Sequence, residues 1–233
     1  MLSTPVAVGG VAVSVTAVHA VGRLADLVDD DLPELLRSDL LKLAATGLLV
    51  GYVAFVEGQS PATLSGRRYA LSVAAALVVA GTAGSLAASV AIAVVADALG
   101  VDGDVAGTTA GIADRPLTAV LFTAAVAGTT EETLYRAYPI ERVATLTGSP
   151  LLGGAVSVVG FGLAHAGYWD RGAAVRIAAQ GLVLTALYLL VRSLPVLVAV
   201  HALHDAVGLV LARRAGGPPE AQAKLDPETD DSQ

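Results

Sequence analysis

The sequence predicts an all-α membrane protein, a polytopic bundle of about seven to eight transmembrane helices. Of the 233 residues, 55% are hydrophobic and only 15% are charged, and the mean hydropathy is +0.68, which lies outside the range of ordinary soluble domains. Apolar runs of about 20 residues, the length that crosses a bilayer as a helix, recur along the chain. Because these runs show no alternation of period two, they fit a helical bundle and not a β-barrel.

Seven apolar runs are the predicted transmembrane helices. They cover approximately residues 5–22, 40–56, 69–96, 116–138, 150–168, 172–191 and 194–212. The first run has no basic segment before it and no small-residue cleavage site, so we interpret it as a retained helix and not a signal peptide. Residues 1–212 are therefore predicted to form a single bundle. The stretch 213–233 combines Pro, Gly and acids without apolar periodicity, which predicts a disordered acidic tail.

The charge pattern favours a multi-pass protein of the cell membrane with a cytoplasmic C-terminus. An odd number of helices puts the first loop and the tail on the same side, and both contain basic residues, namely Arg23, Arg37, Lys42, Arg213 and Arg214. Arg67 and Arg68 in the second loop oppose this orientation. Nothing in the sequence indicates nucleic-acid binding.

Four places in the apolar runs carry ionisable side chains. A charge at mid-bilayer costs at least a few kcal/mol, so such groups usually face a protein or water-filled interior and often mark function. The four places are Glu131 with Glu132 and Arg136; His165; His201 with His204 and Asp205; and His19. We interpret His19 as a hydrogen-bonded packing residue.

Helical spacing indicates how these side chains are used. Glu132 and Arg136 are four residues apart and can form an ion pair on one helix face. Glu131 is rotated by about 100° from Glu132 and lacks that partner, which makes it the candidate general base.

The two histidine clusters also follow helical spacing. Phe161 lies four residues before His165 and on its face, and His201 shares a face with Asp205, while His204 points aside. Taken alone, HALHD at 201–205 could equally be a hydrogen-bonded contact between helices. Three such costly clusters in one small protein favour a functional site.

Together the three clusters resemble the motifs of the CPBP family, the intramembrane CAAX-processing and bacteriocin-processing endopeptidases. The motifs are EETLYR at 131–136, FGLAH at 161–165 and HALHD at 201–205, and the resemblance covers about residues 116–212, the predicted catalytic core. The last position holds Asp205 where many members have Asn. An ionised Asp accepts hydrogen bonds but cannot donate them.

The resemblance implies proteolysis inside the bilayer, on a membrane protein or a lipidated peptide. By this analogy Glu131 and His165 activate a water, His201 stabilises the oxyanion, and Asp205 orients His201. Members are classed as metallo-endopeptidases, and a divalent metal such as zinc is an open alternative. The chain has no cysteine and no H-E-x-x-H motif, but Glu131, His165 and His201 could supply three ligands with water as the fourth.

The predicted site places a demand on helix length. Pro116 and Pro150 are predicted in first helical turns, and Glu131 and His165 each follow fifteen residues later. Antiparallel helices of minimum length would separate them, so the helix carrying Glu131 must be long or broken. Pro139 is the predicted kink that lets it continue past the site.

Two other functions use the same buried residues. An ion-coupled transporter would place a Glu, His and Asp relay inside a bundle, although the sequence shows no pair of related halves. A non-catalytic membrane scaffold would keep the cluster as a polar core.

Overall fold

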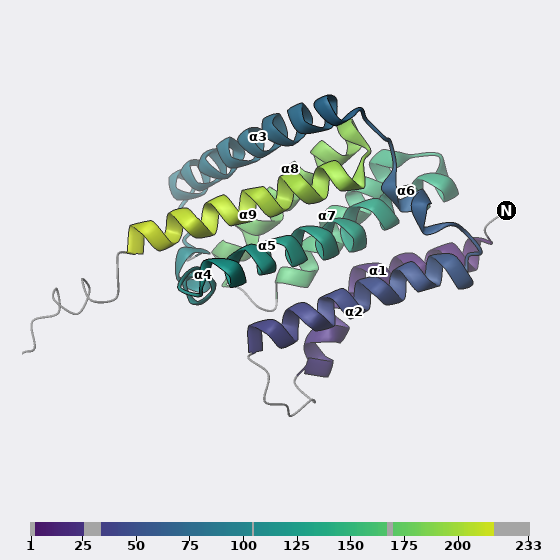
Figure 1. Cartoon of the computed structure of the whole chain (residues 1–233), viewed down its shortest axis with the longest axis horizontal. Coiled ribbons are helices and arrows are strands. Elements are labelled where there is room, and N and C mark those ends of the chain that lie inside the picture. The colour runs from purple at the N-terminus through teal and green to yellow at the C-terminus, as the bar shows by residue number, and fades with distance from the viewer. Residues whose placement is uncertain (1–2, 26–33, 104, 167–169, 217–233) are drawn as a thin grey trace, which may run out of the picture.

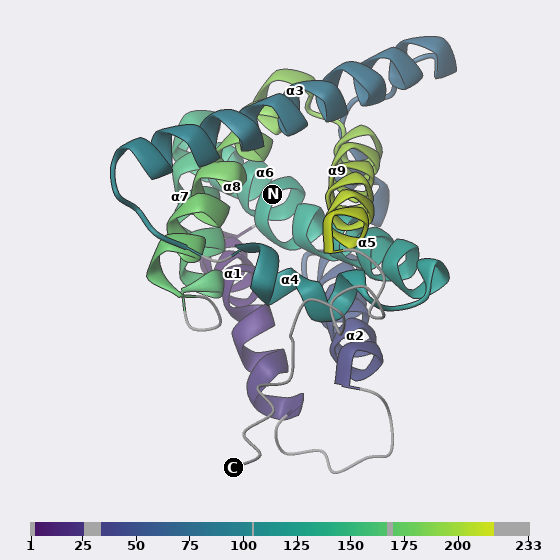
Figure 2. The same cartoon turned by 90° about the vertical axis from the view of Figure 1, so that its left-hand side faces the viewer.

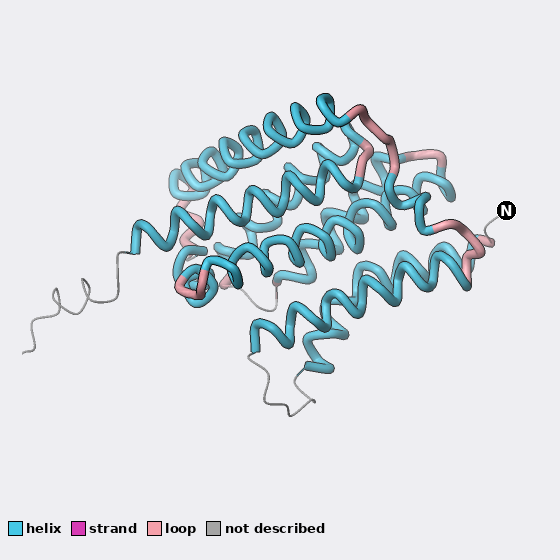
Figure 3. The backbone as a smooth tube through the Cα atoms, viewed as in Figure 1, coloured by secondary structure: helices cyan, strands magenta, loops and turns pink. Residues whose placement is uncertain are grey.

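The computed structural model describes residues 3–25, 34–103, 105–166 and 170–216. Every regular element within these ranges is helical, which confirms the predicted all-α class. The tube in Figure 3 shows helices joined by short loops.

The helices follow the predicted apolar runs closely. They are α1 (Thr4–Ala25), α2 (Glu34–Phe55), the 3₁₀-helix η1 (Pro61–Ser65), α3 (Leu71–Ala98), α4 (Val105–Ala113), α5 (Leu117–Glu131), the π-helix η2 (Glu132–Ala137), α6 (Tyr138–Thr147), α7 (Pro150–His165), α8 (Arg171–Val191) and α9 (Leu194–Gly216). The sequence analysis did not anticipate α4. Because α9 extends to Gly216, the first residues of the predicted tail are helical, and residues 217–233 lie outside the described ranges.

Within the described residues, four helices are long and apolar enough to cross a membrane, at Leu35–Phe55, Leu71–Ala98, Arg171–Val191 and Leu194–Arg214. Shorter apolar helices occupy Thr4–Val18 and Pro150–His165. These helices identify a membrane protein, while the count of seven to eight spans stays a prediction.

The helices form three groups around the segment that carries Glu131. In Figure 1, α3 covers α8 and α9, the stretch from α5 to α6 runs through the middle with α7, and the pair α1 and α2 lies beneath. The end-on view in Figure 2 shows α3 and the α1–α2 pair on opposite sides. The packing of α5 against α9 and of α6 against α7 brings the three motifs toward one region.

The helix carrying Glu131 is both long and irregular, as the sequence analysis required. Together α5, η2 and α6 form a helical stretch of 31 residues. Pro139 lacks an N–H, and in an α-helix its ring would clash with the carbonyl of Tyr135. The chain widens into a π-helix just before it, and the Tyr138 N–H donates to the Thr133 carbonyl five residues back. Such π segments frequently occur at functional sites.

The same proline leaves a carbonyl that α1 satisfies. In the π pattern the Leu134 carbonyl would face the nitrogen of Pro139, which has no hydrogen to donate. The hydroxyl of Ser14 in α1 donates to this carbonyl instead. Both residues are fully buried, and an unpaired polar group in such a place is costly. α1 therefore holds the π-helix in place from outside the motif-bearing half.

Candidate active site

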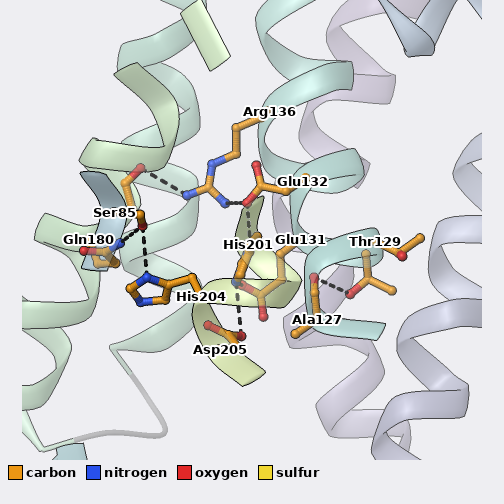
Figure 4. Close-up of polar contacts among 12 residues, drawn as sticks. Ser85, Ala127, Thr129, Glu131, Glu132, Arg136, Gln180, His201, His204 and Asp205 are labelled. Carbon is orange, nitrogen blue, oxygen red and sulfur yellow. Dashed lines mark hydrogen bonds and ion pairs between the residues drawn. The ribbon is translucent and has the colours of Figure 1, made fainter. Parts of the chain in front are cut away.

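His201 is the centre of the polar cluster drawn in Figure 4, and three carboxylates surround it. Its Nδ1 lies 2.6 Å from Glu132 Oε1. On the other side of the ring, Nε2 lies 3.3 Å from Asp205 Oδ2 and 3.9 Å from Glu131 Oε2. The structure thus brings the first and third motifs together.

A glycine lets the two motif-bearing helices approach. A side chain at Gly128 in α5 would meet the Val198 carbonyl at 2.8 Å and the Ala202 nitrogen at 3.0 Å, both in α9. Small residues allow such close contact between membrane helices. Since Gly128 lies one turn before Glu132, the contact brings His201 within reach of that carboxylate.

Arg136 connects the cluster to α7 and α8. Its Nη1 donates to Glu132 Oε1 at 3.0 Å, so the ion pair that the four-residue spacing predicts is present. Its Nη2 donates to the Gly181 carbonyl at 3.1 Å, and the guanidinium carbon lies 4.2 Å from the centre of the Phe161 ring, a cation–π contact. Glu132 and Arg136 are both fully buried, so each compensates the charge of the other.

Glu132 has a second role that the sequence analysis missed. The same Oε1 accepts hydrogen bonds from Arg136 and from His201, and Oε2 has no partner within the described part of the chain. Glu132 and His201 are 69 positions apart, so no local spacing could have linked them. The ion pair fixes Glu132, and Glu132 in turn fixes the imidazole of His201.

His165 lies apart from the cluster. Arg136 of η2 contacts Phe161 of α7, and His165 lies one turn further along α7. Its Nδ1 lies 2.9 Å from the Phe161 carbonyl, and its ring centre lies 4.3 Å from that of Phe161. Within the described ranges it makes no ion pair with Glu131.

His204 faces away from His201, toward α3 and α8, as its position aside from the shared face suggests. Its ring nitrogens lie close to Ser85 and Ser89, and both serines bond Gln180. The sequence analysis missed these three residues. Gln180, an amide within an apolar run, is the signal that could have found them. His19 lies in α1, but its side chain is outside the described part of the structure.

Access to the cluster differs between its carboxylates. The side chains of Glu131 and Asp205 are 14% and 31% exposed, whereas that of Glu132 is inaccessible. A polar cavity of about 360 Å³ beside Arg192 and an apolar cavity of about 310 Å³ beside Val15 are lined by other residues. The accessible side of the cluster is therefore the side of Glu131 and Asp205.

The His, Asp and Glu side chains of the cluster are not arranged as the ligands of a metal ion. Among the described residues, no three His, Asp or Glu side chains are placed to hold a metal ion. The predicted ligand His165 makes its polar contact with a carbonyl of its own helix, and Nδ1 of His201 is bonded to Glu132. The residues as arranged do not fit a ligand set of Glu131, His165 and His201.

Comparison with known proteins identifies the motif-bearing segment. Residues 113–207 match the family model described as type II CAAX prenyl endopeptidase Rce1-like. This match contains all three motifs and confirms the resemblance to the CPBP family for this part of the chain. Searches of curated proteins and of solved structures gave no match.

Proposed function

Because residues 113–207 match the Rce1-like endopeptidases, an intramembrane protease family, we propose that this chain hydrolyses a peptide bond of a membrane-associated substrate. The observation that carries the proposal is the asymmetric environment of His201. Glu132 holds its Nδ1, while its Nε2 faces Glu131 and Asp205 on the accessible side. An oriented imidazole beside a carboxylate of this kind suits acyl-group hydrolysis.

Glu131 is the proposed general base. Its carboxylate takes a proton from a water, and the water oxygen forms a bond to the carbonyl carbon of the substrate. When the tetrahedral intermediate collapses, the carbon–nitrogen bond breaks and Glu131 returns the proton to the leaving amine. Glu131 is partly exposed and makes no ion pair with Arg136; Asp205 shares both properties but lies closer to Nε2 of His201, at 3.3 Å against 3.9 Å, which suits it to orient that ring.

His201 is the proposed oxyanion stabiliser. With both nitrogens protonated, its Nδ1–H donates to Glu132, and its single Nε2–H is shared between Asp205 and the carbonyl oxygen on which negative charge develops. Asp205 accepts only, so its role is to orient His201. The role of His165 with Glu131 in water activation stays a prediction.

The test is a cleavage assay with purified protein in lipid nanodiscs. The substrates are a peptide with a prenylated C-terminal motif, its unlipidated form and a transmembrane peptide, with products identified by mass spectrometry. We expect one membrane-associated peptide to be cut at a single bond. Absence of cleavage across the panel, combined with proton flux in proteoliposomes, would favour the transporter instead.

Chelation tests the metal alternative in the same assay. We expect activity to survive a strong chelator and extensive dialysis, because the described donors form no three-ligand set. Loss of cleavage on chelation, restored by adding zinc, would show that the donors rearrange around a metal.

We also propose the cell membrane as the site of action, with the C-terminus in the cytoplasm. The basic residues of the first loop and after α9 support this orientation.

A further inference from the structure

Four polar side chains from three helices form a closed ring of hydrogen bonds beside the active site, and Figure 4 shows three of them, Ser85, Gln180 and His204. Gln180 of α8 donates from Nε2 to Ser85 Oγ at 2.7 Å and accepts at Oε1 from Ser89 Oγ at 2.9 Å. Both serines belong to α3. Across the ring, Ser85 Oγ lies 3.1 Å from His204 Nδ1 and Ser89 Oγ lies 3.4 Å from His204 Nε2.

The ring fits only one charge state of His204. Ser85 accepts from Gln180, so its hydroxyl hydrogen is free to go to His204 Nδ1; Ser89 gives its hydrogen to Gln180, so it accepts from His204 Nε2–H. If the amide of Gln180 is turned over, every bond reverses its direction together. In either direction the imidazole donates once and accepts once, which only a neutral ring can do.

A second proton on His204 would break the ring. Both nitrogens of His204 would then donate, so one serine would receive two hydrogen bonds. The hydroxyl hydrogen of that serine would lose its acceptor in the ring. An unpaired hydroxyl is costly where water is scarce, and Ser85 is fully buried.

The ring fixes the rotation of α9 about its axis. His204 is tied to α3 and α8, while His201, three residues earlier, is tied through Glu132 to the π-helix. Two anchors to different neighbouring helices leave α9 little freedom to turn, and even a rotation by one residue would be about 100°. Asp205 follows His204 directly, so its direction toward His201 Nε2 depends on both anchors.

We propose that Ser85, Ser89 and Gln180 are positioning residues of the active site, which hold a neutral His204 and thereby aim Asp205 at His201. Ser85 and Ser89 lie in α3, outside the segment that matches the family model. α3 therefore contributes to the catalytic geometry and is not only a membrane span. The catalytic part of this inference rests on the proposed function.

The test compares Ser89→Ala with Ser89→Thr in the cleavage assay. Ser89→Ala opens the ring, and we expect kcat to fall about 10- to 100-fold, the scale of a misplaced catalytic group, with KM nearly unchanged. Ser89→Thr keeps the hydroxyl at a half-buried position and is expected to restore most of kcat. Thr82→Ala, which removes from the same helix a hydroxyl with no hydrogen-bond partner in the described part of the chain, is the control and should leave kcat near wild type.

Nitrogen-15 NMR of labelled histidine tests the ring without any substrate. We expect His204, identified by loss of its signals in His204→Asn, to show one protonated and one unprotonated nitrogen at neutral pH. Two protonated nitrogens would overturn the ring, and an unchanged kcat in folded Ser89→Ala would overturn the positioning role. If wild type cleaves nothing but His204 shows the neutral pattern, the proposed function and the positioning role fail while the ring stands.

Discussion

Glu131→Gln is expected to lower turnover by about two to four orders of magnitude, the range that general-base catalysis supplies. The amide keeps the volume of the carboxylate but cannot take a proton from water. Because Glu131 is partly exposed and makes no contact with Arg136, its charge is not needed for the buried ion pair. Thermal unfolding should therefore match wild type. The measurement is cleavage of one membrane-embedded peptide at matched occupancy of the site.

Glu132→Gln is the matched comparison, since it makes the same change one residue along. It removes the charge that compensates Arg136, so we expect lower thermal stability. It also weakens the hydrogen bond that orients His201, so turnover of the folded fraction should fall, but less than in Glu131→Gln. Cleavage by Glu131→Gln at the wild-type rate would show that Glu131 is not the base.

Arg136→Ala is expected to destabilise the fold by about 3 to 5 kcal/mol, the typical cost of removing one partner from a buried ion pair. Glu132 would be left charged, fully buried and without its cation, and the Gly181 carbonyl and the Phe161 ring would each lose a contact. The measurement is thermal unfolding in detergent, with activity expressed per folded molecule.

Arg67→Ala provides the control for removal of an arginine. Its side chain is exposed and makes no ion pair within the described ranges, so stability should be nearly unchanged. If Arg136→Ala has the thermal stability of wild type yet loses cleavage, Arg136 takes part in the chemical step. The assignment of Glu131 as the base and of the Glu132–Arg136 ion pair as structural support would then be wrong.

The fold class could be predicted because it depends on local properties. The length and composition of each apolar run require a membrane helix, and the spacing from Glu132 to Arg136 places both on one face. A long or broken helix at Glu131 was predicted because Glu131 and His165 each lie fifteen residues after a proline, Pro116 and Pro150, that is expected in a first helical turn. This prediction correctly anticipated the stretch from α5 to α6, although a π-helix and not a simple kink accommodates Pro139.

The contacts of the site could not be predicted to the same degree. Glu131, Glu132, His201 and Asp205 were all identified from the sequence, yet Glu132 was assigned only to Arg136. His201 was expected to share a face with Asp205, and the structure has that contact, but the hydrogen bond between His201 and Glu132 was not predicted. The ring of Ser85, Ser89, Gln180 and His204 was not anticipated, because serines in apolar helices carry little signal on their own.

By itself, the sequence determined that this is an all-helical membrane protein with three polar motifs, because the bilayer fixes helix length and local spacing fixes which residues share a helix face. Only the tertiary structure decided which motifs meet. The approach of α5 to α9 at Gly128, the hydrogen bond from Ser14 to the π-helix and the anchoring of His204 by α3 each join residues far apart in the chain. Such contacts depend on how helices rotate and pack against one another, and the periodicity of a single helix contains no information about its neighbours.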